Sequence, residues 1–313
     1  MASVVVVALA TAGIWWGVAS AASEPAVPAA SALPDSTRMG SVELVTENLE
    51  PMRAFYVDAV GLEVLAEDAD RLSLGSGGDE VLSIALADDR AADAPAEAGL
   101  YHSAILYPDE QSLARTLLNV ATLAPESYTG SADHAVSLAF YFADPDGNGL
   151  ELYTDTPQDE WVWEGGLVRM GSAPLDPNAF MQEYLDQAPT DGMPTDATPT
   201  MGHVHLRVGD LESARAFYAD TLGFAVTAEA PGAVFFAAGG YHHHVATNTW
   251  SSAGASARPE SLGLGSLTVH LGDESALTAV ADRLTDAGAT FTQDAGLLTV
   301  DDPWGNTVRL LAE

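Results

Sequence analysis

Strand-like and helix-like spacings of apolar residues follow one another in a fixed order along most of the chain. A strand is expected at 42–46, and the next segment carries Leu49, Met52 and Tyr56 at helical spacing and ends at Gly61. Short β-rich runs follow, and then a new strand and a new helix begin. The same succession is expected at 101–107 and 109–120, at 204–208 and 211–222, and at 265–271 and 274–287. The pattern predicts an α+β fold built from four βαβββ modules.

The two halves of the chain repeat each other. Segments 49–61 and 211–223 share the pattern Leu-Glu-x-x-Arg-Ala-Phe-Tyr-x-Asp-x-x-Gly. Each half also closes with an Asp-Pro-x-Gly-Asn turn, at 144–148 and at 302–306, which leads into a last strand. Two independent matches indicate that the halves are homologous and that each contains two modules.

The repeat sets the expected domain boundaries. Residues 38–155 form a first domain of two modules, and residues 201–313 form a second. Residues 156–200 are rich in Pro, Asp, Thr and Gly, so they are interpreted as a connector with one short helix at 178–186.

Residues 1–37 precede the first module and combine a hydrophobic segment with a linker. The stretch 4–22 is uncharged and just long enough to span a bilayer, but no Lys or Arg precedes it. A targeting or anchoring segment and an extension that the protein does not need both stay open. In the second case the ordered chain would begin near Met39.

The amino-acid composition limits both the partners and the metal ligands that the protein can use. The chain carries 45 acidic residues against 11 basic ones, with a net charge of −34, and all the basic residues are Arg. Acidic residues spread along the whole sequence are typical of a protein from a high-salt cytoplasm, and the lack of a basic face argues against nucleic acid as a partner. Cys is absent. A metal would therefore be held by His and carboxylate groups.

Five motifs point to a known family. They are Gly-Leu-Tyr-His-Ser-Ala at 99–104, Asp-His-Ala-Val-Ser at 133–137, Asp-Pro-Asp-Gly-Asn-Gly-Leu-Glu-Leu-Tyr at 144–153, Gly-His-Val-His-Leu at 202–206, and the triple-His segment at 239–250. Over residues 38–313 the chain resembles the vicinal oxygen chelate superfamily of glyoxalases, bleomycin-resistance proteins and extradiol ring-cleaving dioxygenases. It is most similar to the four-module catechol-2,3-dioxygenase-like members. One departure is Leu138, where relatives often carry Glu.

This resemblance implies that modules pair into two open-barrel domains, with a metal held by residues of the first and last strands. The first-strand positions hold Ser41, His102, His203 and Ser266 in modules one to four, and the last-strand positions hold Glu151 in module two and Arg309 in module four. An Fe(II) site of this kind uses two imidazoles and one carboxylate, and neither half of the chain supplies that set alone.

Pairing of modules two and three, a permuted arrangement, would complete the set. It would bring His102, Glu151 and His203 together and leave modules one and four without metal ligands. We therefore expect these three residues to bind the metal. The alternative for Glu151 is a solvent-facing residue of its strand.

Other histidines are candidates for acid–base catalysis. His134 follows Asp133, which could orient the ring by a hydrogen bond, although a turn before a strand would look the same. The triple-His segment is expected to alternate across a strand, so that His242 and His244 face the barrel together. Packing of these rings is the alternative to catalysis.

Two further positions lie close to these groups in sequence. His205 would share the strand face of His203 and is a substitute ligand. Asn248 and Trp250 are interpreted as pocket-shaping or structural residues.

The resemblance implies an extradiol dioxygenase that opens a small aromatic diol with O2 at a mononuclear metal site, with Fe(II) as the cofactor and Mn(II) as the alternative. A glyoxalase-like lyase or isomerase, which would need a second carboxylate, and a metal-free binding protein of the bleomycin-resistance kind are the other functions considered. We expect a cytoplasmic protein that can form homo-oligomers. The alternative is a protein that residues 1–22 anchor to a membrane or export, and a membrane is a partner only if residues 4–22 act as an anchor.

Overall fold

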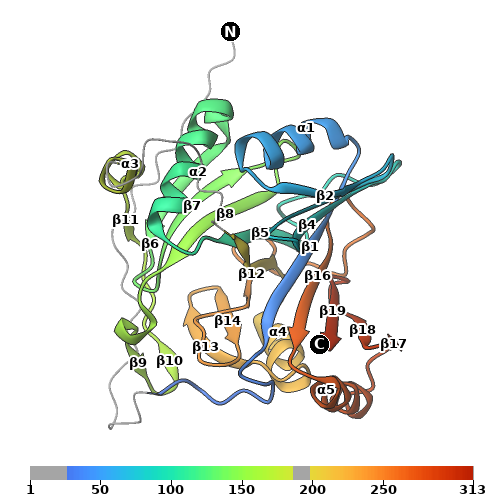
Figure 1. The fold of residues 1–313 in the computed structure, drawn as a ribbon. Helices are drawn as coiled ribbons and strands as arrows, with labels where there is room; N and C mark the ends of the chain where they lie inside the picture. The colour runs from blue at the N-terminus through green and yellow to red at the C-terminus, as the bar shows by residue number, and fades with distance from the viewer. Residues whose placement is uncertain (1–26, 186–197, 313) are drawn as a thin grey trace.

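The computed structural model of the protein describes residues 27–185 and 198–312 (Figure 1). The bilayer-length stretch 4–22 and the last residue of the expected helix at 178–186 lie outside these ranges. Within them, no helix combines the length and the apolarity that crossing a membrane would need.

The first half of the chain contains two βαβββ modules. Module one comprises β1 (Arg38–Thr46), α1 (Leu49–Arg53), the π-helical turn η1 (Ala54–Ala59), β2 (Glu63–Glu67), β3 (Arg71–Ser76) and β4 (Asp79–Leu86). Module two comprises β5 (Gly99–Leu106), α2 (Glu110–Leu123), the short helix η2 (Pro125–Ser127), β6 (Tyr128–Asp133), β7 (Ser137–Ala143) and β8 (Gly149–Asp155).

The second half repeats this order. Module three comprises β12 (Thr200–Arg207), α4 (Leu211–Arg215), the π-helical turn η4 (Ala216–Thr221), β13 (Ala225–Ala230), β14 (Ala233–Ala237) and β15 (Val245–Asn248). Module four comprises β16 (Gly263–Leu271), α5 (Glu274–Asp286), β17 (Phe291–Asp294), β18 (Leu297–Asp301) and β19 (Thr307–Ala312). The α+β prediction of four such modules is confirmed.

The connector is more structured than one short helix. It contains η3 (Gln158–Glu160), β9 (Trp163–Glu164), β10 (Leu167–Val168), β11 (Ala173–Pro174) and α3 (Pro177–Leu185). The helix lies where the sequence placed it. Strand β11 pairs with β6 and so extends the sheet of module two.

The modules assemble into two curled sheets, each of which takes one module from either half of the chain. One sheet has the order β17-β18-β19-β16-β1-β4-β3-β2, and the other has the order β11-β6-β7-β8-β5-β12-β15-β14-β13. Antiparallel pairs β1–β16 and β5–β12 form the two junctions. Module two therefore pairs with module three and module one with module four, so the contiguous ranges 38–155 and 201–313 are not the sheet-forming pairs.

The long helices cover the convex faces of the sheets, as α2 and α5 show in Figure 1. Their buried residues recur at helical spacing, for example Leu113, Leu117 and Val120 in α2. Asp109 caps α2 by accepting a hydrogen bond from the Ser112 amide at 2.7 Å. The main apolar core thus lies between helices and sheets.

The end of the expected N-terminal linker packs onto the modules. Leu33 is buried in the main core, the Ala29 amide donates to the Gly166 carbonyl at 3.0 Å, and the Ala32 amide donates to the Gly223 carbonyl at 2.8 Å. Ordered contacts therefore begin before Met39, because the segment places Leu33 in the core and forms two backbone hydrogen bonds, to Gly166 and Gly223.

Candidate metal centre

Three neighbouring strands, in the order β8-β5-β12, carry the predicted ligands. Ala104 of β5 lies opposite both Glu151 of β8 and His203 of β12 in the strand registers. Because side chains alternate along a strand, Leu150 and Leu152 enter the apolar core while Glu151 points to the concave face. The alternation of strand residues thus places a carboxylate beside two imidazoles.

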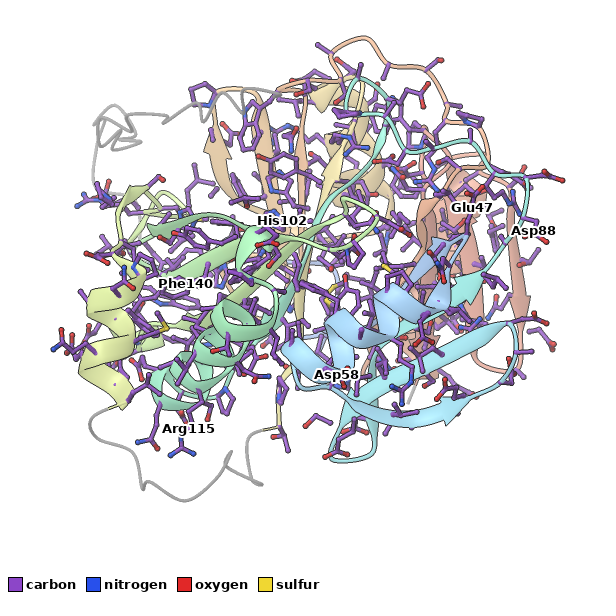
Figure 2. All side chains as sticks on the ribbon, turned by 90° about the horizontal axis from the view of Figure 1, so that it is seen from above. Glu47, Asp58, Asp88, His102, Arg115 and Phe140 are labelled. Carbon is purple, nitrogen blue, oxygen red and sulfur yellow. The ribbon has the colours of Figure 1, made fainter. Side chains whose placement is uncertain are left out.

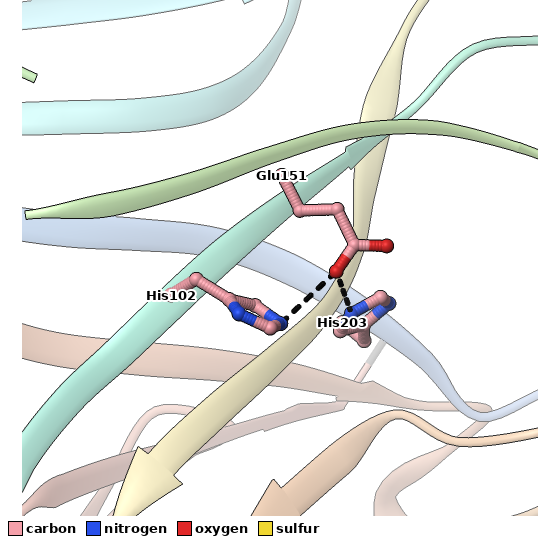
Figure 3. A group of neighbouring side chains, drawn as sticks. All are labelled: His102, Glu151 and His203. Carbon is pink, nitrogen blue, oxygen red and sulfur yellow. Dashed lines mark hydrogen bonds and ion pairs between the residues drawn. The ribbon is translucent and has the colours of Figure 1, made fainter. Parts of the chain in front are cut away.

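The three side chains converge on one point (Figure 3). Nε2 of His102 lies 3.1 Å, and Nε2 of His203 3.3 Å, from the same Oε2 of Glu151. One potential ligand atom from each residue lies within 4.8 Å of the others, and all three residues are buried. Figure 2 shows His102 in the interior of the molecule, while Arg115 and Asp88 lie at its periphery.

The charges of this group suit a divalent cation. Burial alone would raise the pKa of Glu151, but the imidazoles of His203 and His102 hold it well below its usual range. Burial lowers the pKa of His203 to about 4. At neutral pH a buried carboxylate therefore faces a neutral imidazole, which is the protonation state that metal ligands need.

Within the described residues, the Nε2 atoms of the two imidazoles have no hydrogen-bond partner outside the group itself, since Nε2 of His203 is bonded to Oε2 of Glu151. Nε2 of His102 is buried and forms no well-aligned hydrogen bond within the described residues, although Oε2 of Glu151 lies near it. Two imidazole nitrogens and one carboxylate oxygen are the donor set of a mononuclear Fe(II) or Mn(II) site. The residues present fit such a metal.

His134 lies next to this centre, paired with a tyrosine that the sequence analysis did not single out. Its Nε2 lies 2.7 Å from the hydroxyl of Tyr141, and its Nδ1 lies 2.6 Å from the Gly171 carbonyl oxygen. Since a carbonyl only accepts, Nδ1 carries the proton and Nε2 accepts from the tyrosine. The ring of Tyr141 lies 5.6 Å from that of His102. Its position opposite Glu151 in the β7–β8 register is the signal that could have identified it.

The expected orientation of His134 by its neighbour is wrong. The carboxylate of Asp133 accepts from the Ala135 amide at 2.8 Å and stabilises the turn. Ala135 itself has a φ of 69°, in the left-handed region that residues other than glycine rarely adopt. The short link between β6 and β7 explains both features, because the carboxylate closes a local turn two residues ahead.

The triple-His segment does not form the expected strand. It lies in the connection between β14 and β15, after Gly239 and Gly240 turn the backbone with φ values of 64° and 73°. Regular alternation is lost there, so His242 and His244 do not share one face. Instead, Nδ1 of His242 lies 2.8 Å from Nδ1 of His243.

These histidines have separate partners. Nε2 of His242 lies 2.9 Å from Oδ1 of Asp155, whereas Nδ1 of His244 accepts from the Ala238 amide at 3.3 Å. Burial lowers the pKa of His244 to about 3. His244 is thus a neutral residue that caps local backbone and does not join the three ligands. His242 belongs to a buried hydrogen-bond group beside them.

That buried group packs against one ligand. The ring centroid of His203 lies 4.1 Å from that of His243 and 4.9 Å from that of Tyr153. The Tyr153 hydroxyl lies 2.8 Å from the hydroxyl of Tyr241, which donates to Asp155 at 3.3 Å. Asp155 therefore reaches the ring of His203 through two chains of contacts. One runs through His242 and His243, and the other runs through Tyr241 and Tyr153.

The remaining sequence candidates lie at the edges of the centre. His205 is buried, with its ring centroid 5.0 Å from that of His102, and its Nε2 lies 3.0 Å from Nδ2 of Asn248. It is not one of the three converging residues. Leu138 packs against the apolar core, so the departure from the family pattern lies on the face away from the metal centre.

The positions equivalent to the ligands in the other sheet carry different chemistry. Ser41 lies on β1, Ser266 on β16 and Arg309 on β19. Arg309 lies opposite Thr268 and Thr299 in the strand registers.

Known proteins agree with this architecture. The family model of the Glyoxalase/Bleomycin resistance protein/Dioxygenase superfamily matches residues 38–152 and 200–310. The catechol-2,3-dioxygenase of Bacillus subtilis (strain 168) is 36% identical over 276 residues, 86% of this chain and 95% of that protein.

Solved structures share the fold. A structure from Bacillus subtilis matches with a TM-score of 0.59 at 10% identity, covering 88% of this chain and 84% of that one. Glyoxalase I from Zea mays matches with a TM-score of 0.54 at 16% identity, covering 88% of this chain and 92% of that one. The sequence resemblance is thereby confirmed, and the chain belongs to the Glyoxalase/Bleomycin resistance protein/Dioxygenase superfamily.

Proposed function

We propose that the protein is an extradiol dioxygenase that cleaves a catechol-type ring beside its two hydroxyls. The observation that carries the proposal is the convergence of His102, His203 and Glu151 from three neighbouring strands. The relationship to a catechol-2,3-dioxygenase over most of the chain supports the oxidoreductase class.

His102, His203 and Glu151 would hold the metal, with Fe(II) as the expected ion and Mn(II) as the alternative. When bound by three residues on one side, such an ion supplies neighbouring open positions for the two diol oxygens and for O2. The protein contributes a buried environment, because Ala104, Ala139 and Tyr153 form an apolar cluster on the same concave face.

The pair of Tyr141 and His134 is placed to handle protons. Nε2 of His134 accepts from the Tyr141 hydroxyl, so the pair can take a proton from a hydroxyl of the diol and return it to the product. Burial raises the pKa of Tyr141 well above its usual value, and the charge of Glu151 raises it further. The tyrosine is therefore protonated before the reaction, and it can accept the diol proton only as its own proton passes to Nε2 of His134.

The other functions are less well supported by the site. A glyoxalase-like reaction was expected to use a second carboxylate among the ligands, and the converging group in the described residues contains only Glu151. A metal-free binding protein would have been favoured had the three side chains stayed apart.

The test is anaerobic loading of the full chain with Fe(II), followed by metal analysis and by O2 uptake with catechol. Wild type should bind one metal per chain and release a yellow ring-opened product. His102→Ala, His203→Ala and Glu151→Ala should each lose the metal. Ser41→Ala, at the position of module one equivalent to His102, should keep both metal and activity.

Two results would contradict the proposal in different ways. If folded wild type binds no metal, the ligand assignment is wrong. If the metal binds but catechol drives no O2 uptake, the assigned reaction is wrong while the metal centre stands. Far-ultraviolet circular dichroism of each variant shows whether a lost metal reflects a lost fold.

A further inference from the structure

Two half-exposed aromatic side chains lie next to the candidate metal centre. Tyr101 is 41% exposed and Trp250 is 48% exposed. Their ring centroids lie 5.4 Å apart, and each lies close to the ring of His205, at 4.9 Å and 5.4 Å. The three rings meet edge to face, an arrangement that leaves aromatic surface open to a further ring.

Trp250 is held firmly although it is half exposed. Its indole Nε1 donates to the Pro231 carbonyl at 2.9 Å. Gly232 lies so close that a Cβ added there would come within 2.8 Å of the indole. A large aromatic side chain that is both fixed and open to solvent is typical of a binding surface, because little conformational entropy is lost when a ligand contacts it.

This aromatic pair lies on the more exposed side of the centre. The ring of Tyr101 is 5.3 Å from that of His102, and His205 lies between the exposed pair and the same ligand. Exposure falls from these rings to the buried His102, and on the other side of the centre Tyr153 and His242 are fully buried. The side of the centre that carries Tyr101 and Trp250 is therefore more exposed than the side that carries Tyr153 and His242.

The charges near this aromatic pair favour an uncharged group. Arg207 is the cation whose charge acts on Tyr101. Arg207 is itself paired with Asp93, whose two carboxylate oxygens lie 2.7 Å and 2.6 Å from its Nη2. Arg207 is thus already neutralised by Asp93, and a carboxylated substrate gains no ion pair with it.

We infer that Tyr101 and Trp250 determine specificity by contacting a ring substituent that extends out of the site, and that the preferred substrates are catechols with an uncharged aryl group. This inference rests on the proposed function, since it names the substrate class for the same metal centre. The two residues would bind the substituent by stacking while the diol lies at the ligands.

The experiment measures binding and turnover separately. Fe(II)-loaded full-length protein is titrated without O2 by calorimetry, with catechol, 3-phenylcatechol and 4-phenylcatechol as probes, and O2 uptake is then recorded with each. Wild type should bind at least one phenylcatechol roughly 10-fold more tightly than catechol. Trp250→Ala and Tyr101→Ala should remove most of that preference, because affinity for the phenylcatechol falls further than affinity for catechol.

Two further variants serve as controls. Trp250→Phe keeps an aromatic ring and should keep most of the preference, which also covers the case in which Trp250→Ala fails to fold. Tyr128 is likewise 41% exposed, but it pairs with Phe142, whose ring belongs to the apolar core. Tyr128→Ala should therefore keep the full preference.

The outcomes separate the two proposals. If wild type does not prefer a phenylcatechol, or if the Trp250 and Tyr101 variants lose affinity for all three probes equally, the specificity inference is overturned while catechol turnover can still stand. If the preference appears in binding and depends on both residues but no probe drives O2 uptake, the inferred surface stands and the proposed reaction fails.

Discussion

The hydroxyl of Tyr56 donates to the buried carboxylate of Asp144 at 3.0 Å, across a sequence separation of 88 residues. Tyr218 donates to Asp302 at the same distance in the second half of the chain. Each bond joins the π-helical turn of one module to the Asp-Pro-x-Gly-Asn turn of the next. Because the sheets join modules two with three and one with four, these two bonds complete a ring of contacts through all four modules.

Loss of either tyrosine hydroxyl should destabilise the fold. In Tyr56→Phe a buried carboxylate oxygen keeps only its bond from Asn148, so we expect a loss of about 1–3 kcal/mol in the free energy of unfolding. Tyr218→Phe should cost a similar amount because its contacts are equivalent. Urea unfolding at pH 7 measures both. Tyr128→Phe, which removes an exposed hydroxyl, should cost less than about 0.5 kcal/mol, and equal losses in all three variants would contradict the role of the buried bonds.

The same carboxylate should make stability depend on pH. Burial raises the pKa of Asp144 to about 6, against an ordinary value near 3.8 in the unfolded chain. The folded state therefore binds the proton more tightly, and this contribution is complete below pH 4 and is lost as the pH rises through 6. Between pH 4.5 and 7.5 it should fall by about 2 kcal/mol.

The measurement compares wild type with Asp144→Asn, which cannot ionise, by urea unfolding at both pH values. Taking the difference between the two proteins removes the titration of the other carboxylates. The stability of wild type relative to the variant should fall by that amount between the lower and the higher pH. Parallel pH profiles would show that Asp144 does not titrate in this range.

Much of the architecture could be predicted from the sequence because it depends on local patterns of residues. Periodicity and the internal repeat predicted four modules, and the helix at α5 begins and ends within a residue of its expected position. The pairing of modules two and three followed from chemistry, since only that arrangement brings His102, His203 and Glu151 together.

The residues that surround the three metal ligands were harder to predict because their partners are distant in sequence. Nothing near His242 indicates that Asp155 accepts its hydrogen bond from 87 residues away. Gly239 and Gly240 break the alternation on which the strand interpretation of the triple-His segment depended. Tyr141 was hidden by its apolar neighbours, and only the strand register reveals that it lies opposite Glu151.

Relief of the strained turn beside His134 should stabilise the protein. Ala135 has a φ of 69°, a conformation in which glycine avoids the Cβ clash. We expect Ala135→Gly to raise the free energy of unfolding by up to about 1 kcal/mol, since part of the gain is offset by the greater freedom of glycine in the unfolded chain. Ala132→Gly, in the neighbouring strand β6, should lower it. Urea unfolding of both variants tests this, and a loss in both would contradict the strain.

Asp155 should affect metal affinity without touching the metal ligands. Its carboxylate binds His242 and Tyr241, whose own partners His243 and Tyr153 pack against the ring of His203. Both bonds go to the same Oδ1, which Asp155→Asn keeps, but the variant removes the negative charge and so weakens both bonds. The imidazole of His203 is then held less firmly, and we expect the Kd for Fe(II) or Zn(II) to rise about 10-fold.

Competition with a chromophoric chelator under anaerobic conditions measures that Kd, and urea unfolding of the metal-free protein gives the accompanying change in stability. Asp159→Asn, an exposed position in η3, is the matched control and should change neither quantity. A variant of Asp155 that is less stable but binds the metal as tightly as wild type would limit this residue to a structural role. A weaker metal site in a protein of nearly unchanged stability would instead show that the orientation of His203 depends on the hydrogen bonds of Asp155 with His242 and Tyr241.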